Sequence, residues 1–167
     1  TAVHAELGDI TLRSQVEAIL EFTRLLGLRL LQVEGVEADD VIGTLARAAE
    51  EAGMDCVIST GDKDMAQLVT DRTSLTNTMT ASATDRTGVK QKYDVTPEQF
   101  VDFLALTGDT SDNIPGVEKC GPKTAAKWLN DWGSLDAIMA HADKVGGKIG
   151  ENLRAALGQL PLSRQLA

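Results

Sequence analysis

Apolar residues recur every three or four positions from residue 12 to residue 26, a spacing that predicts an amphipathic helix. Gly27 follows the last apolar residue and is suited to end that helix. A second helical segment, rich in Ala and Leu, is predicted at residues 38–51, before Gly53. Between these helices, the apolar residues 28–33 predict a short strand.

The middle of the chain predicts two further strands. Residues 55–59 are rich in β-branched side chains and predict a buried strand, followed by a loop at 60–62 and a short helix at 63–69. Residues 74–80 alternate loosely and predict a strand near the sheet edge, before a polar loop that runs through Gly88. Strands that alternate with helices indicate a parallel α/β core.

The pattern becomes helical from residue 96 to the end. TPEQ at residues 96–99 is a capping box with Pro97 at the first helical position, and apolar residues follow at helical spacing. We therefore predict two parts that pack together, an α/β core at residues 1–95 and a helical subdomain at residues 96–167.

Composition narrows the class of protein. A chain of 167 residues with 43% hydrophobic residues can bury a core as one domain with a small addition. The net charge of −9 argues against a uniformly basic nucleic-acid surface but allows a local basic patch. Cys56 and Cys120 lack metal-ligand spacing and are expected to be reduced and buried. No apolar stretch reaches the roughly 20 residues of a membrane span, so we expect a soluble, cytoplasmic protein with no membrane contact.

Acidic side chains gather at three places where predicted strands or loops meet helices. They are Glu37, Asp39 and Asp40 in EADD, Asp62 and Asp64 in GDKD, and Asp109 and Asp112 in GDTSD. Asp is also common in turns and helix caps, so one cluster alone would mean little. Three clusters at element ends predict a site for Mg²⁺ or Mn²⁺, which prefer oxygen ligands.

The spacing within each cluster is compatible with convergence on one site. Asp62 and Asp64 are predicted to point the same way from an extended loop. The pairs Glu37 with Asp40, and Asp109 with Asp112, are predicted to share a helical face. Lys63 lies between two acids, where a salt bridge that closes the loop is favoured over a phosphate contact.

Residues 113–129, NIPGVEKCGPKTAAKWL, predict a glycine-punctuated hairpin between two helices. Pro122, Lys123 and Thr124 begin the second helix, whose N-terminus is suited to bind a DNA phosphate without reading sequence. The alternatives are an ordinary helix turn with solvated lysines and a P-loop. The P-loop is disfavoured because Pro122 interrupts the motif and no strand precedes it.

The segments EADDVIGTLA, ISTGDKDMAQLV, FLALTGDTSDNIPGV and GPKTAAKWL closely resemble the flap endonuclease family, which includes the 5′-nuclease domains of bacterial DNA polymerases I. The resemblance covers residues 28–167. It implies a PIN-like nuclease core with a parallel sheet, followed by a helix-hairpin-helix-type DNA-binding subdomain. The implied activity is metal-dependent, structure-specific 5′→3′ exonuclease or 5′-flap endonuclease cleavage of DNA in replication and repair.

The resemblance also implies roles for individual residues. All seven acids become ligands of two metal ions, and those assigned to catalysis are Asp39, Asp40, Asp62, Asp64 and Asp112. The implied DNA-binding residues, in a hairpin that also takes a monovalent cation such as K⁺, are Gly116, Lys119, Gly121, Lys123, Thr124 and Lys127. The implied partners are DNA with 5′ flaps, nicks or duplex ends and a covalently attached polymerase domain.

The sequence departs from the family pattern in two ways. Lys119 and Cys120 stand where the hairpin more usually carries Gly and an aliphatic residue. The family's first strands, which end in metal-binding Asp residues, and its basic helical arch have no counterpart here and are expected to be absent. Two alternative functions follow: a DNA-binding fragment with an incomplete metal site, and a receiver-like phosphotransfer domain.

Overall fold

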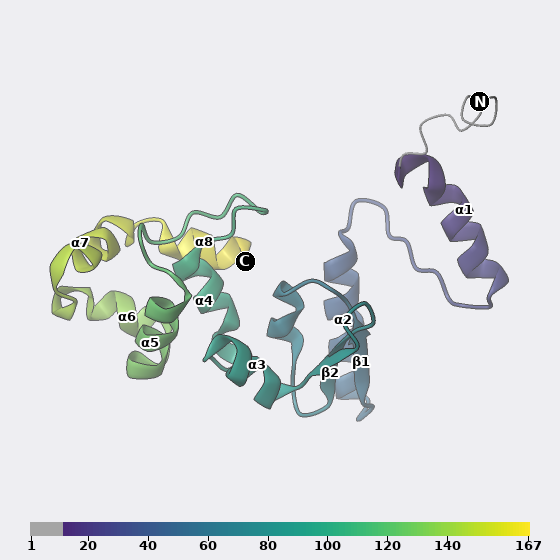
Figure 1. Ribbon diagram of the computed structural model, residues 1–167, viewed down its shortest axis with the longest axis horizontal. Helices are drawn as coiled ribbons and strands as arrows, with labels where there is room; N and C mark the ends of the chain where they lie inside the picture. The colour runs from purple at the N-terminus through teal and green to yellow at the C-terminus, as the bar shows by residue number, and fades with distance from the viewer. Residues whose placement is uncertain (1–11) are drawn as a thin grey trace, which may run out of the picture. The chain divides into compact units, whose positions relative to one another are not determined.

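The computed structural model describes residues 12–167 and divides into two compact units, which meet in the chain between Val41 and Ile42 (Figure 1). Asp9 and the rest of residues 1–11 lie outside the described part. We describe each unit by itself.

The first unit contains the predicted N-terminal helix but not the strand predicted after it. Helix α1 spans Leu12–Leu25, and Gly27, at φ 76°, follows it. Residues 28–33 form no strand in the described chain; the Leu28 N–H instead donates to the Thr23 carbonyl at 3.3 Å. A strand requires a partner backbone to complete its hydrogen bonds, and the described residues of this unit supply none. Helix α2, Ala38–Glu51, begins in this unit and continues into the second.

The sheet of the second unit has three strands in the order β1-β2-β3 among the described residues. Strand β1, Cys56–Ser59, pairs in parallel with β2, Thr73–Asn77, which pairs antiparallel with β3, Ser82–Thr84. The expected parallel pair is therefore present in a mixed sheet. The predicted burial of β1 is wrong, because only Ile58 is buried and Val57 is 67% exposed. The predicted edge position of β2 is wrong because the three-residue β3, too short to give an alternating pattern, covers its other side.

The polar segment through Gly88 contains a helix that the sequence reading did not predict. Helix α3 spans Arg86–Tyr93, and the Asp85 carboxylate accepts a hydrogen bond from the Gly88 N–H at 2.8 Å. This N-cap stabilises the first turn and offsets the poor helix propensity of Gly88. Asp94, in the left-handed conformation, ends the helix.

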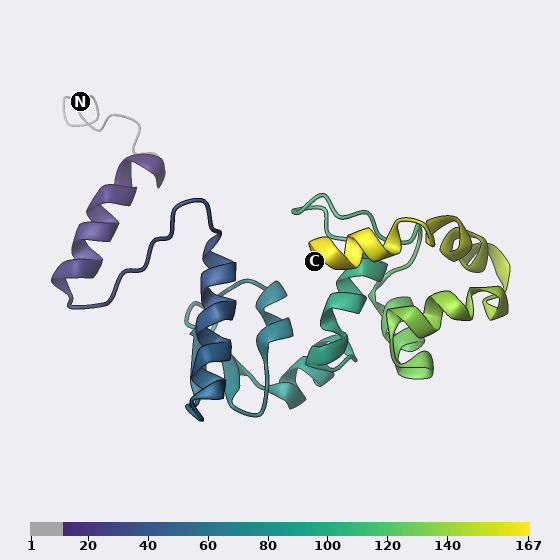
Figure 2. The same cartoon turned by 180° about the vertical axis from the view of Figure 1, so that it is seen from behind.

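The rest of the second unit is helical, as predicted (Figure 2). The predicted capping box begins the 3-10 helix η2, Pro97–Gln99, which leads into α4, Phe100–Thr107. The elements that follow are α5 Pro122–Trp132, α6 Leu135–Ala140, the 3-10 helix η3 Ala142–Lys144, α7 Gly147–Ala156 and α8 Leu160–Leu166.

One hydrophobic core joins the sheet region to the helices. Helix α4 packs against the 3-10 helix η1, Asp64–Leu68, and against α5 and α8. Its side chains Phe100 and Leu106 are fully buried, as is Leu129 of α5. Within the second unit, the sheet region therefore packs with the helices that follow it, while the two-part division at residue 95 stays a prediction.

The cysteines, the tryptophans and the lengths of the apolar helices can also be examined in the structure. Cys56 and Cys120 are free thiols; Cys120 is buried as predicted, which raises its pKa to about 12, but Cys56 is only partly buried. Trp128 is buried in the core, and Trp132 stacks on His141 with the ring centroids 6.5 Å apart. Within residues 12–167, no helix is long and apolar enough to cross a membrane.

Candidate metal centre and nucleic-acid interface

Three of the seven predicted acids come together in the second unit. One carboxylate oxygen from each of Asp64, Asp109 and Asp112 lies within 4.8 Å of the other two. Asp109 is buried, Asp64 is partly buried and Asp112 is exposed. Asp64 is thus brought next to two acids that lie 45 and 48 positions further along the chain, in a cluster that is exposed to solvent at Asp112.

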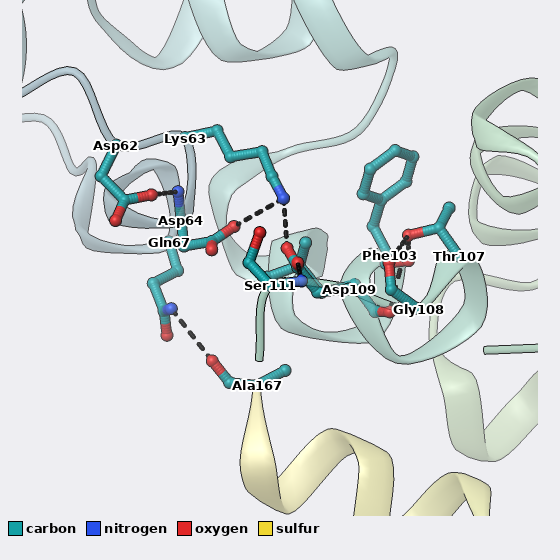
Figure 3. A network of polar contacts seen from close by, with 11 residues as sticks. Asp62, Lys63, Asp64, Gln67, Phe103, Thr107, Gly108, Asp109, Ser111 and Ala167 are labelled. Atoms are coloured by element: carbon teal, nitrogen blue, oxygen red, sulfur yellow. Dashed lines mark hydrogen bonds and ion pairs between the residues drawn. The ribbon is translucent and has the colours of Figure 1, made fainter. Parts of the chain in front are cut away.

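The GDKD loop after β1 places Asp64 in the acid cluster, whereas the Asp62 carboxylate accepts a backbone hydrogen bond within the loop. The Thr60 hydroxyl accepts a hydrogen bond from the Asp62 N–H at 2.9 Å. The Asp62 carboxylate accepts one from the Asp64 N–H at 3.0 Å (Figure 3). These contacts turn the chain into η1, where Asp64 is the first residue. Asp62 is exposed and is not one of the three clustered acids, so its predicted role as a ligand stays a prediction.

Asp109 and Asp112 lie in a tight turn after α4. The predicted shared helical face is wrong because Gly108, at φ 76°, ends the helix, and Asp109 pairs with Ile114 in an antiparallel bridge. The Asp109 carboxylate accepts the Ser111 N–H at 2.8 Å, which closes the turn. This turn, rather than helical spacing, places both acids near Asp64.

A close backbone contact fixes the base of that turn. A Cβ atom added to Gly116 would lie 2.4 Å from the Gly108 nitrogen and 2.4 Å from the Thr107 carbonyl carbon. Real Cβ contacts do not approach so closely, so only glycine fits at this crossing. The Val117 N–H donates to the Leu106 carbonyl at 2.9 Å just beyond it. The crossing joins the acidic turn to the start of the hairpin.

Lys63 supplies the positive charge at the acid cluster. Its ammonium donates a hydrogen bond to Asp109 Oδ2 and lies 3.6 Å from Asp64 Oδ1 (Figure 3). The predicted salt bridge that closes the loop is thereby confirmed. The sequence showed that Lys63 lies between two acids, but it did not show the contact with Asp109, 46 residues away.

The environment shifts the acids in opposite directions. Burial raises the pKa of Asp64, and the neighbouring Asp62, Asp109 and Asp112 charges raise it further. The hydrogen bond from Lys63 lowers the pKa of Asp109, with help from the Ser111 N–H. The same hydrogen bond raises the pKa of Lys63. Crowded carboxylates of this kind are stabilised by an added cation.

The donor set fits a divalent metal. Asp64 Oδ1 is buried and has no hydrogen-bond partner, so it is a ready acceptor for a cation. The three side chains offer only carboxylate oxygens, the ligands that Mg²⁺ and Mn²⁺ prefer. Asp64, Asp109 and Asp112 would therefore be the residues that hold it.

The acids of the EADD segment lie at the start of α2, in the first unit. Asp39 and Asp40 occupy the first helical turn, and Glu37 directly precedes the helix. All three are exposed. Their convergence with Asp64, Asp109 and Asp112 stays a prediction.

The predicted basic hairpin lies between α4 and α5. Gly121 is the N-cap of α5, Pro122 takes the first helical position, and Lys123 is exposed in the first turn. Lys119 is also exposed and has a left-handed backbone at φ 65°, a conformation that favours glycine. Thr124 is partly buried, and Lys127 forms an ion pair with Asp131.

Helices α7 and α8 hold the hairpin through contacts that the sequence reading missed. Asn152 donates to the Glu118 carbonyl at 2.8 Å, Gln159 to the Gly116 carbonyl at 3.2 Å, and Ser163 to the Pro115 carbonyl at 2.9 Å. Ser163 is only 1% exposed. The sequence signal is weak, since Asn152 and Ser163 are polar residues within helices and Gln159 is the N-cap of α8, and most such residues face water.

Comparison with known proteins places this geometry in a family. Residues 8–94 match the family model for the 5′-3′ exonuclease N-terminal resolvase-like domain, and residues 95–167 match that for the 5′-3′ exonuclease C-terminal SAM fold. DNA polymerase I of Pseudomonas aeruginosa is 58% identical over 135 residues, which are 80% of this chain and 15% of that protein. The thermostable DNA polymerase I of Thermus thermophilus is 43% identical over 92% of this chain and 18% of that protein. The chain thus spans less than a fifth of the length of these relatives.

Solved structures show the same fold. A mutant of the T5 5′-exonuclease superposes with a TM-score of 0.83 at 24% identity, over 92% of this chain and 63% of that one. A T5 flap endonuclease in a complex with DNA and metal ions also gives 0.83 at 24% identity, over 92% of this chain and 57% of that one. The family matches leave no support for the receiver-like alternative. This chain belongs to the 5′-3′ exonuclease family, as a domain that its relatives carry within DNA polymerase I.

Proposed function

We propose that the chain is the metal-dependent nuclease part of a DNA polymerase I, which cleaves phosphodiesters at 5′ flaps and in the 5′→3′ direction from nicks or duplex ends. The observation that carries this proposal is the cluster of Asp64, Asp109 and Asp112, in which the buried oxygen Asp64 Oδ1 accepts no hydrogen bond. The turn that holds two of these acids leads directly into the basic hairpin, so metal and DNA contacts would be neighbours.

The acids would act as ligands rather than as nucleophiles. Asp64, Asp109 and Asp112 would hold Mg²⁺ or Mn²⁺, and a two-metal site would also use Glu37, Asp39, Asp40 and Asp62. Bound metal ions of this kind activate a water and stabilise the leaving oxygen in phosphodiester hydrolysis. The hydrogen bonds from Ser111 to Asp109, and from Asp64 to Asp62, would keep the carboxylates oriented.

The hairpin would bind the DNA backbone without reading sequence. Its proposed contacts are Gly116, Lys119, Gly121, Lys123, Thr124 and Lys127. The first N–H groups of an α-helix lack intrahelical partners, so the start of α5 favours a phosphate, and the exposed lysines add charge. We also propose that hairpin carbonyls take a monovalent cation such as K⁺, which can be tested by replacing K⁺ with tetramethylammonium in the binding assay.

The proposed partners are DNA and the remainder of a polymerase. One T5 flap endonuclease neighbour is a complex with DNA and metal ions, which supports DNA as the ligand of the shared fold. The curated relatives are DNA polymerases I, in which the matching segment is a small part of a longer chain. We therefore propose a covalently attached polymerase domain.

Asp112→Asn tests the nuclease proposal. Asp112 is exposed, so its loss should leave the fold intact while removing one ligand charge. We expect cleavage of an end-labelled 5′-flap duplex with Mn²⁺ to fall at least about 100-fold, since metal chemistry supplies several kcal/mol of transition-state stabilisation. Flap binding, measured by fluorescence anisotropy, should stay within about twofold.

The matched control is Asp143→Asn, an exposed acid in η3 outside the cluster, which should cleave like the parent chain. EDTA should abolish cleavage in both. Binding without any metal-dependent cleavage by the parent chain would instead support the binding-only alternative. Equal cleavage by Asp112→Asn and the parent would refute the assigned role of Asp112.

A further inference from the structure

Lys63 holds the position at the acid cluster that a cation would take. Its ammonium contacts Asp109 Oδ2 and approaches Asp64 Oδ1, two oxygens of the proposed ligand set. The other oxygen of Asp109 already accepts the Ser111 N–H, so Oδ2 is the one left for an incoming metal. A lysine ammonium and a divalent ion would compete for the same oxygen.

Charge repulsion makes joint occupancy unfavourable. Like charges a few ångströms apart repel strongly where water is scarce, and Asp109 is 5% exposed. Lysine binds carboxylates as a point charge on a flexible stem, without the fixed fork that holds an arginine in place. The Lys63 side chain is also 47% exposed, so it can move without unpacking the core.

A cavity beside the cluster gives the displaced side chain a place to go. It has a volume of about 180 Å³, and Lys63 is part of its lining. The wall is mixed: it carries the hydroxyl residues Thr60 and Thr84 and the amide of Asn77, together with apolar Leu75 and a second lysine, Lys92. Asp62 also lines the cavity, so an ammonium there would keep an acidic neighbour.

We propose that Lys63 is an exchangeable counter-ion, which neutralises the acid cluster in the metal-free protein and swings into this cavity when a divalent cation binds. The inference rests on the proposed function, since it assumes that the cluster takes a metal. It adds that the chain keeps its crowded carboxylates neutralised between metal-binding events, and that metal affinity is set partly by Lys63.

Mn²⁺ binding to the 167-residue chain, followed by electron paramagnetic resonance, tests the proposal without reference to cleavage. Removal of the competing charge in Lys63→Met should tighten Mn²⁺ binding about tenfold. Lys63→Arg, which keeps the charge, should bind Mn²⁺ more weakly than Lys63→Met. Lys148→Met, which removes an exposed lysine of α7 outside the cavity, is the matched control and should bind like the parent.

Thermal unfolding distinguishes the loss of the Lys63 charge from a general loss of structure in Lys63→Met. Without metal, Lys63→Met should unfold at a lower temperature than the parent, because three clustered acids lose their counter-charge. The rise in unfolding temperature on adding Mn²⁺ should be larger in Lys63→Met than in the parent. A general loss of structure in Lys63→Met would instead lower both the metal-free unfolding temperature and its rise on adding Mn²⁺, and it would weaken Mn²⁺ binding.

Acylation of lysines, read by mass spectrometry, follows the movement itself. Labelling of Lys63 should increase on adding Mg²⁺, while labelling of Lys127, which is paired with Asp131, should not change. Equal or weaker Mn²⁺ binding by Lys63→Met would overturn this inference alone. No Mn²⁺ binding by either the parent or Lys63→Met would overturn the proposed metal site together with it.

Discussion

The acidic turn at residues 108–114 and the basic hairpin at residues 115–121 are consecutive in the chain but treat charge differently. In the turn, Asp109 is buried and already neutralised by Lys63. In the hairpin, Lys119 is exposed on a left-handed backbone, and Lys123 is exposed at the start of the next helix. The proposed metal ligand Asp109 is thus already ion-paired, whereas the lysines proposed to contact DNA phosphates are exposed. DNA binding should therefore be sensitive to salt concentration.

Both regions depend on a rigid backbone. The Gly108–Gly116 crossing anchors the end of the acidic turn, and the same residue Gly116 begins the hairpin. Ser163 of α8 and its N-cap residue Gln159 donate hydrogen bonds to the carbonyls of Pro115 and Gly116. A change at the crossing should therefore disturb both functions, while a change of one exposed charge should disturb only one.

Gly116→Ala should have the largest effect, because it disrupts the Gly108–Gly116 crossing on which both regions depend. The added Cβ would overlap backbone atoms at 2.4 Å, so we expect the free energy of unfolding to fall by about 3 kcal/mol. Urea denaturation would measure it. Gly121→Ala is the matched control: nothing lies within 4 Å of its Cβ, and the loss should stay within about 1 kcal/mol. Equal losses would contradict the crossing as the anchor.

Lys123→Ala should separate the two regions. We expect DNA affinity to fall several-fold and the slope of log affinity against log salt to lessen by about one, with Mn²⁺ binding unchanged. Anisotropy titrations at several salt concentrations would measure this. Lys127→Ala should have a smaller effect, since Asp131 already neutralises Lys127. If Lys123→Ala has the same slope of log affinity against log salt as the parent, Lys123 does not contact a DNA phosphate.

Lys119→Gly tests whether the left-handed backbone of the hairpin is strained. At φ 65° a lysine is strained, so glycine should raise the free energy of unfolding by about 0.5 to 1 kcal/mol. Lys119→Ala removes the same charge without relieving the strain and should give no gain. Thermal unfolding of the three proteins would measure the difference. A gain in the alanine variant as well would assign the effect to charge.

Glu98→Gln, outside both regions, should have the smallest effect. Arg86 donates to Glu98 at 2.5 Å and lowers the pKa of that carboxyl. A lowered folded-state pKa adds stability above the unfolded-state value, and that stability is lost as the pH falls through the folded-state value. Glu98 is largely exposed and Arg86 is partly exposed, so we expect only a few tenths of a kcal/mol at pH 7 and none near pH 2. Urea denaturation at both pH values would show it.

Local signals predicted much of the fold. The Thr96 capping box, the Ala-rich α2 and the β-branched β1 were all readable because neighbouring residues determine them. The strand predicted at residues 28–33 failed since a strand needs a partner that no local pattern reports. Likewise, β3 was too short to be recognised.

The candidate site was predictable in residue type but not in geometry. Asp64, Asp109 and Asp112 were all identified, but the turn that holds Asp109 and Asp112 was read as a helix, because a spacing of three residues fits both. Contacts that span long stretches of chain could not be read from spacing. Lys63 with Asp109 and Ser163 with Pro115 are such contacts, and they depend on tertiary packing.

The most direct test of the central claim is a crystal of this chain soaked in Mn²⁺, with the ion located by anomalous scattering. The claim predicts a peak roughly 2.2 Å from carboxylate oxygens of Asp64, Asp109 and Asp112, with the Lys63 ammonium moved off Asp109. A peak elsewhere, or none at these acids while other sites fill, would contradict the metal centre described above.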